Sequence, residues 1–377
     1  MLPCFCNLRK VGPKYPDMLH STSESTVSQA TLLQKTSKLG AEYEATPISS
    51  DYLVYQAIGV GCFGAASIFL SQHIPSNVFT VLRLIDLERL SSSQMEDVQN
   101  EMKLSQLINH THVARYLCSF VVGTKLWALQ PLMHYGSCAD IMHSAQPFRN
   151  GFKEPVISII LRDIVSGLQY LHSLGFVHRS VRAKHFLIHE DGIVKLSGLR
   201  SVVSMIEDGA RVKALHGHFT GTVDNICWLA PELLSQDLSG YSFQSDVYSV
   251  GIAALELATG EAPFAGLPVT EIMMLKLRGH PPVLMKKDDG EKDGQISTHL
   301  SKVIDLCVDP DPSRRPSPAK LLNTSLLKVR KKVAPNTLKD LLLPVVPLDT
   351  SKLNVAETGL ESMLEALNTT TTEIIWT

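Results

Sequence analysis

Residues 59–64 read GVGCFG, with glycines spaced so that backbone amides could approach the oxygens of a phosphate group. A dinucleotide-binding fold would follow such a loop with a helix and place an acidic residue ~20 residues further on. Here a second apolar, strand-like run follows instead. The pattern therefore favours a loop between two strands that covers a nucleotide phosphate, formed by Ile58, Gly59, Gly61 and Gly64. A plain tight turn is the alternative.

A charged side chain lies within the next strand-like run, TVLRLI. Arg83 could grip a phosphate or a carboxylate with two donors. Glu101, in the helical segment that follows, is placed to be its ion-pair partner. We therefore expect Arg83 and Glu101 to pair and to contribute to the nucleotide site, and a strand arginine with an unrelated surface partner is the alternative.

The segment VHRSVRAKHFLI at 177–188 has the spacing of the protein kinase pattern H-R-D-L-x-x-x-N. In that pattern the Asp accepts the proton of the substrate hydroxyl and the Asn holds a magnesium ion. Ser180 and His185 stand at those positions, and Gly198 in IVKLSGLRS stands where the D-F-G sequence has its metal-binding Asp. Serine is a poor base at neutral pH, and imidazole prefers softer metals than magnesium. We expect neither phosphate transfer nor a magnesium site.

The segments that hold a kinase fold together are intact. Glu232 is expected to pair with a late arginine, Arg315, and Asp246 is expected to hold the backbone of the loop at 178–185. The order and spacing of these elements make a chance match improbable. The matching segments are WLAPE (228–232), SDVYSVG (245–251), PF (263–264) and DPSRRPS (311–317).

The composition along the chain divides it into three parts. Residues 1–50 are rich in Ser and Thr without a sustained period, which predicts a disordered leader. Residues 51–330 begin with β-branched, apolar runs and continue with apolar helical patterns. They predict an α+β, bilobal, protein-kinase-like fold with a small β-rich lobe and a larger helical lobe. Residues 331–377 form a tail with a last helical pattern, LESMLEAL, at 360–367.

Several elements are expected at definite places. The strands and turns are a hairpin around the Pro-Ser-Asn turn at 75–77, strands near 113–122 and 125–133, and an Asp-Gly turn at 191–192. The helices are an amphipathic one at 94–108, a buried one opened by Pro155, and one opened by Ser245 or Asp246 as a cap and ended by Gly260.

With these residues in view, the chain from about 52 to 330 resembles a protein kinase of the Sterile-twenty-like group, and specifically the STRAD (Sterile-twenty-related adaptor) pseudokinases. The replacements carry the resemblance as much as the retained motifs do. They include VHRSVRAKHFLI, LSGLRS, VLRLIDLE, HYGS, GYSFQSDVYSVGI and WLAPELL.

The resemblance implies a catalytically silent partner that binds liver kinase B, activates it allosterically and influences its cytoplasmic localisation. It implies ATP that is bound but not hydrolysed, without a need for magnesium, and a cytoplasmic and nuclear protein. The partner contact would lie between Leu199 and Trp228, where a kinase docks its substrate. A helical-repeat scaffold protein docks on the family's C-terminal Trp-Glu-Phe, of which only Trp376 is present here, in EIIWT.

Two other functions stay open from the residues alone. A weakly active or unconventional Ser/Thr kinase could use Arg83, a nucleotide under the glycine loop, and a metal held through His185 or Glu190. A nucleotide sensor with another client is the third. Replacing Ser180, His185 and Gly198 together by the family residues would separate these functions.

The overall composition narrows the class of protein. A formal net charge of −2 argues against nucleic-acid binding, and no apolar stretch approaches the length of a membrane span. Seven cysteines without paired zinc spacing predict free thiols. Cys4 and Cys6 are expected to be unmodified thiols rather than acylation sites, and the basic run KVRKK at 328–332 a solvated helix end.

Overall fold

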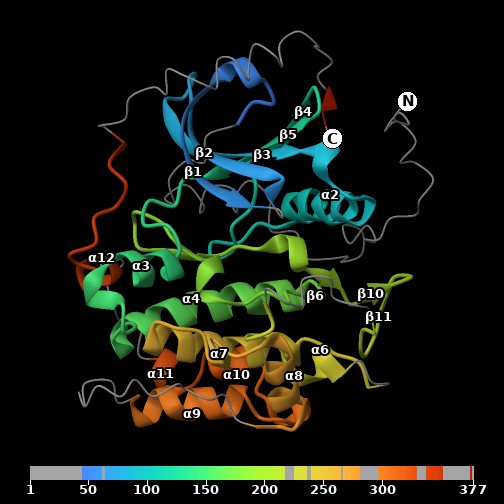
Figure 1. Ribbon diagram of the computed structural model, residues 1–377, viewed down its shortest axis with the longest axis vertical. Coiled ribbons are helices and arrows are strands. Elements are labelled where there is room, and N and C mark those ends of the chain that lie inside the picture. The colour runs from blue at the N-terminus through green and yellow to red at the C-terminus, as the bar shows by residue number, and fades with distance from the viewer. Residues whose placement is uncertain are drawn as a thin grey trace, which may run out of the picture.

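The computed structural model describes residues 45–61, 64–216, 225–235, 239–264, 266–280, 296–328 and 337–350, and the backbone of 374–375. Most of the expected leader, the helical pattern at 360–367 and Trp376 lie outside these residues. Within them the chain forms a sheet-rich lobe followed by a helical lobe, as Figure 1 shows. The predicted α+β, bilobal protein-kinase-like fold is confirmed.

The first lobe is an antiparallel sheet in the order β1-β2-β3-β5-β4-β12. The hairpin between β2 and β3 turns at the expected Pro-Ser-Asn sequence, where Asn77 adopts a positive φ of 58°. The first apolar run forms two strands, which pair on either side of the glycine loop. The strands are β1 Tyr52–Gly61, β2 Ala66–His73, β3 Val78–Asp86, β4 Cys118–Val122, β5 Lys125–Pro131 and β12 Ile374–Ile375.

One helix covers this sheet. Helix α2, Ser92–Leu107, begins with a capping box in which Ser91 and Gln94 satisfy each other's backbone amides. Val98 and Met102 pack against Ile85 and its neighbours in the sheet. Because Glu101 lies on the same buried face, this packing also brings its carboxylate to β3.

The strand expected at 113–122 is shorter than predicted and begins only at Cys118. Val113 and Ala114 instead pair with Leu196 of the helical lobe, and the amide of Ala114 donates to the carbonyl of Leu196 at 2.8 Å. The apolar run therefore connects the two lobes, because the backbone at its start forms its hydrogen bonds with the helical lobe.

Two long helices form the centre of the helical lobe. Helix α4, Glu154–Ser173, has Pro155 in its first turn as predicted and buries apolar residues on most of its circumference. Helix α7, Gln244–Thr259, packs against it and ends at Gly260, whose φ is +80°. The predicted cap at the start of α7 is wrong: the N-cap is Phe243 without a side-chain bond, because Asp246 turns inward.

Shorter elements complete the helical lobe, and the Asp-Gly turn joins β7 to β8 with Gly192 at φ +83°. No helix in the described ranges is long and apolar enough to cross a bilayer. The helices are α3 Cys138–Ser144, α6 Pro231–Ser235, α8 Val269–Leu277, α9 Thr298–Cys307, α10 Pro318–Leu321, α11 Ser325–Lys328 and α12 Thr337–Leu341. The strands are β6 Phe176–Val177, β7 Phe186–Ile188, β8 Val194–Leu196, β9 Val203–Ser204, β10 Ile206–Glu207 and β11 Ala210–Arg211.

The C-terminal segment returns from the helical lobe to the linker between the lobes, which is the segment 132–137 between β5 and α3. Helix α12 contacts α4. Beyond it, the amide of Leu348 donates to the carbonyl of His134 at 2.8 Å. The described part of the tail is therefore attached to the linker.

Candidate functional site

The loop at 178–185 is held by a buried carboxylate of α7. Asp246 accepts hydrogen bonds from the backbone amides of His178 at 2.7 Å and Arg179 at 2.8 Å, and its Oδ2 lies 2.8 Å from Nε2 of His172. Burial alone would raise the pKa of Asp246, but these hydrogen bonds and the nearby imidazoles hold it below its ordinary value. The expected role of Asp246 is confirmed.

A second carboxylate of α7 holds the same loop from the other side. Glu256 accepts the amide of Ala183 at 2.9 Å and the indole N–H of Trp228 at 2.8 Å. Its burial raises its pKa despite these bonds. Glu256 could not be identified from the sequence, because its partners lie 73 and 28 residues away along the chain and no motif spacing connects them.

The expected pair of Glu232 and Arg315 is present and bidentate. The two nitrogens of the guanidinium lie 2.5 and 3.0 Å from the carboxylate oxygens. Arg315 is fully buried and also donates to the carbonyls of Gln244 at 3.0 Å and Asp309 at 2.8 Å. The pair therefore joins α6, α7 and the segment before α10.

The three altered positions lie together inside this frame. Nδ1 of His185 lies 2.7 Å from the carbonyl oxygen of Ser180, which can only accept, so Nδ1 carries the hydrogen. The same nitrogen lies 3.2 Å from Oγ of Ser180. A Cβ placed on Gly198 would lie 2.6 to 2.9 Å from three atoms of the His185 ring. The imidazole therefore occupies the space that a side chain at 198 would need.

Neither His185 nor Ser180 has the chemistry of the residue it replaces. Burial, together with the charge of Arg182, holds the pKa of His185 well below its ordinary value, so the ring is neutral. Ser180 is 2% exposed, and its hydroxyl contacts His185 and Asn225. Magnesium prefers oxygen ligands, and here an imidazole and a glycine stand at the two metal positions. The residues do not fit the ion that the kinase pattern would hold.

The charged residues expected in the first lobe are present and paired. Nη1 of Arg83 lies 3.0 Å from each carboxylate oxygen of Glu101, which confirms the expected pair. Nη1 also contacts the hydroxyl of Tyr116, which donates to Glu101 at 3.1 Å. Burial raises the pKa of Tyr116, so this hydroxyl stays neutral. Tyr116 was missed because nothing in its neighbourhood along the chain points to β3 or α2.

The glycine loop lies between β1 and β2. Gly64 has a φ of +81°, which favours glycine, whereas Gly59 and Gly61 lie outside the left-handed region. Among the described residues, a Cβ on Gly59 or Gly61 would lie no closer than 3.6 Å to any neighbour. The fold therefore requires glycine at 64 but not at 59 or 61. The side chain of Ile58 is 44% exposed.

The residues expected at the partner surface are placed differently from one another. Leu199 is 3% exposed and belongs to the core of the helical lobe, so its assignment as a contact residue was wrong. Trp228 is partly buried, uses its indole N–H on Glu256, and lies under the guanidinium of Arg182 at 5.4 Å. Trp376 lies outside the described residues.

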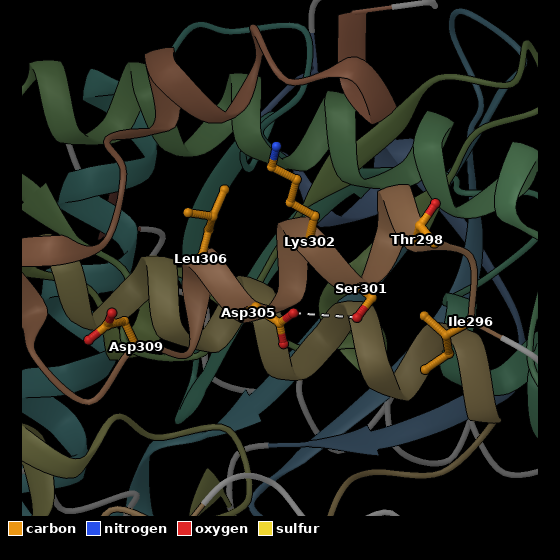
Figure 2. Close-up of a pocket in the computed structure, with 7 residues that line it drawn as sticks. All are labelled: Ile296, Thr298, Ser301, Lys302, Asp305, Leu306 and Asp309. Carbon is orange, nitrogen blue, oxygen red and sulfur yellow. Dashed lines mark hydrogen bonds between the residues drawn. The ribbon is translucent and has the colours of Figure 1, made fainter.

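A shallow pocket lies on the surface of α9, and none of the residues that contact the loop at 178–185 lines it. Its volume is about 490 Å³, and Figure 2 shows Ser301, Lys302 and Asp305 on the helix that lines it. The hydroxyl of Ser301 donates to Asp305 at 3.4 Å, one turn further along. None of the expected site residues lines it, so the loop at 178–185 and the side chains around it remain the candidate functional site.

Comparison with known proteins agrees with this geometry. A model of the protein kinase domain matches residues 52–327. STE20-related kinase adapter protein alpha of Homo sapiens is 33% identical over 339 residues, covering 80% of this chain and 78% of that protein. STE20-related kinase adapter protein beta of Homo sapiens is 31% identical over 386 residues, covering 91% and 92%. The chain therefore belongs to the protein kinase superfamily and, within it, to the family of the STE20-related kinase adapter proteins.

Proposed function

We propose that this chain is a catalytically silent adaptor that binds a Ser/Thr kinase of the liver kinase B type and activates it allosterically. The packing of His185 against Gly198 is the observation that carries the proposal. A neutral ring fills the metal position, while Asp246 and Glu256 keep the loop around it in place. Such a chain offers a kinase surface to a partner and lacks the groups for its own phosphate transfer. The names of the similar adapter proteins support this role.

Activation by binding needs no chemistry from the adaptor. A protein that binds the active conformation of a kinase more tightly than the inactive one shifts the population toward the active form. A shift from 1:99 to 99:1 requires a preference of about 10⁴-fold, or about 5.5 kcal/mol. A rigid surface is suited to this, because it does not adapt equally well to both conformations.

We propose further that the chain binds ATP without transferring its phosphate and without requiring magnesium. Gly59 and Gly61 support this, because neither φ nor packing accounts for glycine there, and close approach of a ligand is a common reason for glycine in a strand. Arg83 supports it as well, because Glu101 and Tyr116 fix the position of its guanidinium. Bound ATP would contact both lobes and stabilise the closed, partner-binding shape.

ATP binding can be tested by thermal unfolding of the purified chain with ATP, with and without magnesium. We expect ATP to raise the melting temperature in the presence of EDTA as well, because the proposed contacts include no metal ligand. Absence of any protection by ATP under both conditions contradicts this part of the proposal.

The partner contact is proposed for the exposed parts of the segment from 200 to 228. Arg182 and Trp228 form a stacked pair beside this segment. Docking of the tail on a helical-repeat scaffold protein through Trp376, and retention of the partner in the cytoplasm, are further parts of the proposal.

The decisive experiment is phosphate transfer to a peptide by a purified kinase of the liver kinase B type, with and without this chain. Each run is repeated with a catalytically dead version of the partner. We expect stimulation that disappears with the dead partner. Transfer that persists with the dead partner would mean that this chain is itself a kinase.

A variant that restores the kinase residues at all three altered positions tests whether these positions alone prevent phosphate transfer. It combines Ser180→Asp, His185→Asn and Gly198→Asp. We expect no transfer by the unaltered chain. A gain of transfer in the variant would show that only these positions separate the chain from an enzyme.

A further inference from the structure

Three potential metal ligands meet where the linker between the lobes contacts the helical lobe. His134 lies in the linker after β5, and His189 and Glu190 lie in the turn between β7 and β8. One ring nitrogen of each histidine and one carboxylate oxygen of Glu190 all lie within 4.8 Å of one another. The proposed adaptor function does not use these residues.

Backbone pairing brings the three side chains together. The amide of Tyr135 donates to the carbonyl of Ile188 at 3.2 Å, and the amide of Ile188 donates to the carbonyl of Gly136 at 3.0 Å. His134 and His189 flank this pairing, and their rings meet edge to face with centroids 5.4 Å apart. The backbone pairing therefore places the two histidines next to each other.

His189 has the carboxylate contact that metal-binding histidines generally have. Its Nδ1 lies 2.8 Å from a carboxylate oxygen of Asp191, so Nδ1 carries the hydrogen and Nε2 keeps its lone pair. Histidines that bind metals generally donate their second nitrogen to a carboxylate or carbonyl in this way. Asp191 would therefore act as a positioning residue for His189.

His134 lacks good hydrogen bonds, although its side chain is only 16% exposed. Its Nδ1 is buried and has no hydrogen-bond partner among the described residues. Its Nε2 lies 3.5 Å from an oxygen of Glu190, which is longer than a normal hydrogen bond. Nε2 of His134 and the oxygen of Glu190 thus face each other at a distance that two ligands of one ion would have.

We propose that His134, His189 and Glu190 bind a divalent ion of the zinc class. Two imidazoles and one carboxylate, with a fourth position for water, are a common zinc ligand set. Zinc bonds of roughly 2.0–2.2 Å place tetrahedral ligands about 3.3 Å apart, so atoms that lie up to 4.8 Å from one another must move closer together. Glu190 can supply part of this movement, because its side chain is 61% exposed, and rotation of the imidazole rings supplies the rest.

A bound ion would connect the linker to the helical lobe beyond the existing backbone pairing. His134 also receives the amide of Leu348 on its carbonyl. The ion would therefore stabilise the position of the linker and of the tail segment that rests on it. Its contribution to stability rises with the free concentration of the ion.

The test uses the purified full-length chain, stripped with EDTA and kept reduced, titrated with zinc chloride by calorimetry and with cobalt(II) by absorption. We expect one ion per chain at this site, a cobalt spectrum without thiolate charge transfer, and a higher melting temperature with zinc. The cobalt readout is needed because the seven cysteines could also bind zinc.

Variants then assign the ion to the cluster. His189→Gln combined with Glu190→Gln should abolish this binding and the zinc-dependent rise in melting temperature, and Asp191→Asn should weaken it by about tenfold or more. His299→Gln, an exposed histidine on α9, is the matched control and should change neither. Zinc binding that is unchanged in the double variant, or a cobalt spectrum due to thiolates alone, would overturn the proposal. The same is true if micromolar zinc does not bind.

Discussion

Two groups of side chains lie in and around the loop at 178–185, and they differ in how many residues of the kinase pattern they keep. The scaffold network, which we define as Asp246, Glu256, Glu232 and Arg315, has the carboxylates and the guanidinium that hold a kinase fold, and all are paired. The altered positions, Ser180, His185 and Gly198, have lost the carboxylates and the amide that carry phosphate transfer.

One group of side chains determines the path of the loop, and the other determines its chemistry. The carboxylates of α7 hold backbone amides, so the loop keeps its path whatever side chains project from it. The altered positions then pack against one another, with His185 on Gly198. The side chains at these positions can therefore be replaced without loss of the fold, and the two groups should respond differently to mutation.

The largest effect is expected when the scaffold network is broken. Arg315→Met leaves Glu232 without its partner, although the carboxylate is only 11% exposed. Removing one member of a buried pair costs about 3–5 kcal/mol, so we expect a loss of this size in the free energy of unfolding, measured in urea.

The neighbouring arginine supplies the control for that measurement. Arg314 is 73% exposed and lies 3.4 Å from Asp311, itself 49% exposed. Arg314→Met should change the free energy of unfolding by less than about 0.5 kcal/mol. Equal losses in the two variants would show that burial of Arg315 is not what makes the scaffold network important.

A smaller effect is expected at the altered positions. Gly198→Asp places a Cβ 2.6 Å from the ring of His185, and overpacking of this kind costs about 1–3 kcal/mol. His185→Asn in the same chain removes the ring and should recover most of that loss. Urea unfolding of the two single variants and the double variant measures the coupling between the positions.

Gly209→Asp separates the clash from backbone strain. Its φ of +78° is close to the +90° of Gly198, but no atom lies within 4 Å of an added Cβ. If Gly209→Asp costs as much as Gly198→Asp, strain alone explains the effect, and the proposed complementarity of His185 and Gly198 is wrong.

Acid should weaken the loop through its buried imidazoles. Burial lowers the pKa of His178 to about 4, and the pKa of His185 is lowered as well. The unfolded chain binds protons below about pH 6.5 that the folded chain does not bind, so stability falls as the pH drops from there toward 4. Each such group contributes up to about 1.4 kcal/mol per pH unit in that window.

The measurement is urea unfolding at several pH values between about 7.5 and 5, compared with His185→Asn, which removes one of the two groups. We expect a shallower dependence on pH in the variant. A free energy of unfolding that is constant across this range would mean that the folded loop accepts the protons.

Much of this architecture could be predicted from the sequence because it depends on local patterns. Periodicity and turn residues placed α4, α7 and the hairpins, and motif spacing brought Arg83 to Glu101 and Glu232 to Arg315. These predictions succeeded where a residue's role follows from its neighbours along the chain or from a kinase motif.

The predictions that failed concern residues whose role depends on tertiary contacts. Leu199 was assigned to a surface by its place in a motif, but its side chain packs in the core. Asp246 was expected as a possible helix cap, but its carboxylate turns to a loop 67 residues away. Tyr116, Glu256 and the meeting of His134 with His189 depend on tertiary contacts that no spacing in the sequence records.

The smallest effect on stability is expected in the glycine loop of the first lobe. Gly61→Ala has room for its Cβ, with the nearest atom at 3.8 Å, and a φ outside the left-handed region. Alanine should therefore change the free energy of unfolding by less than about 1 kcal/mol. If the glycine is there for close approach of a phosphate, the same variant should weaken ATP binding by about tenfold, or about 1.4 kcal/mol.

Gly64→Ala is the counterpart, because the +81° φ at 64 strains alanine while leaving open space around it. It should lower stability by about 1 kcal/mol or more, measured by urea unfolding. ATP affinity, measured by calorimetry, then distinguishes the two glycines. Weaker binding in Gly61→Ala at unchanged stability assigns that glycine to the ligand. Unchanged binding would mean that the glycine at 61 does not serve a bound phosphate.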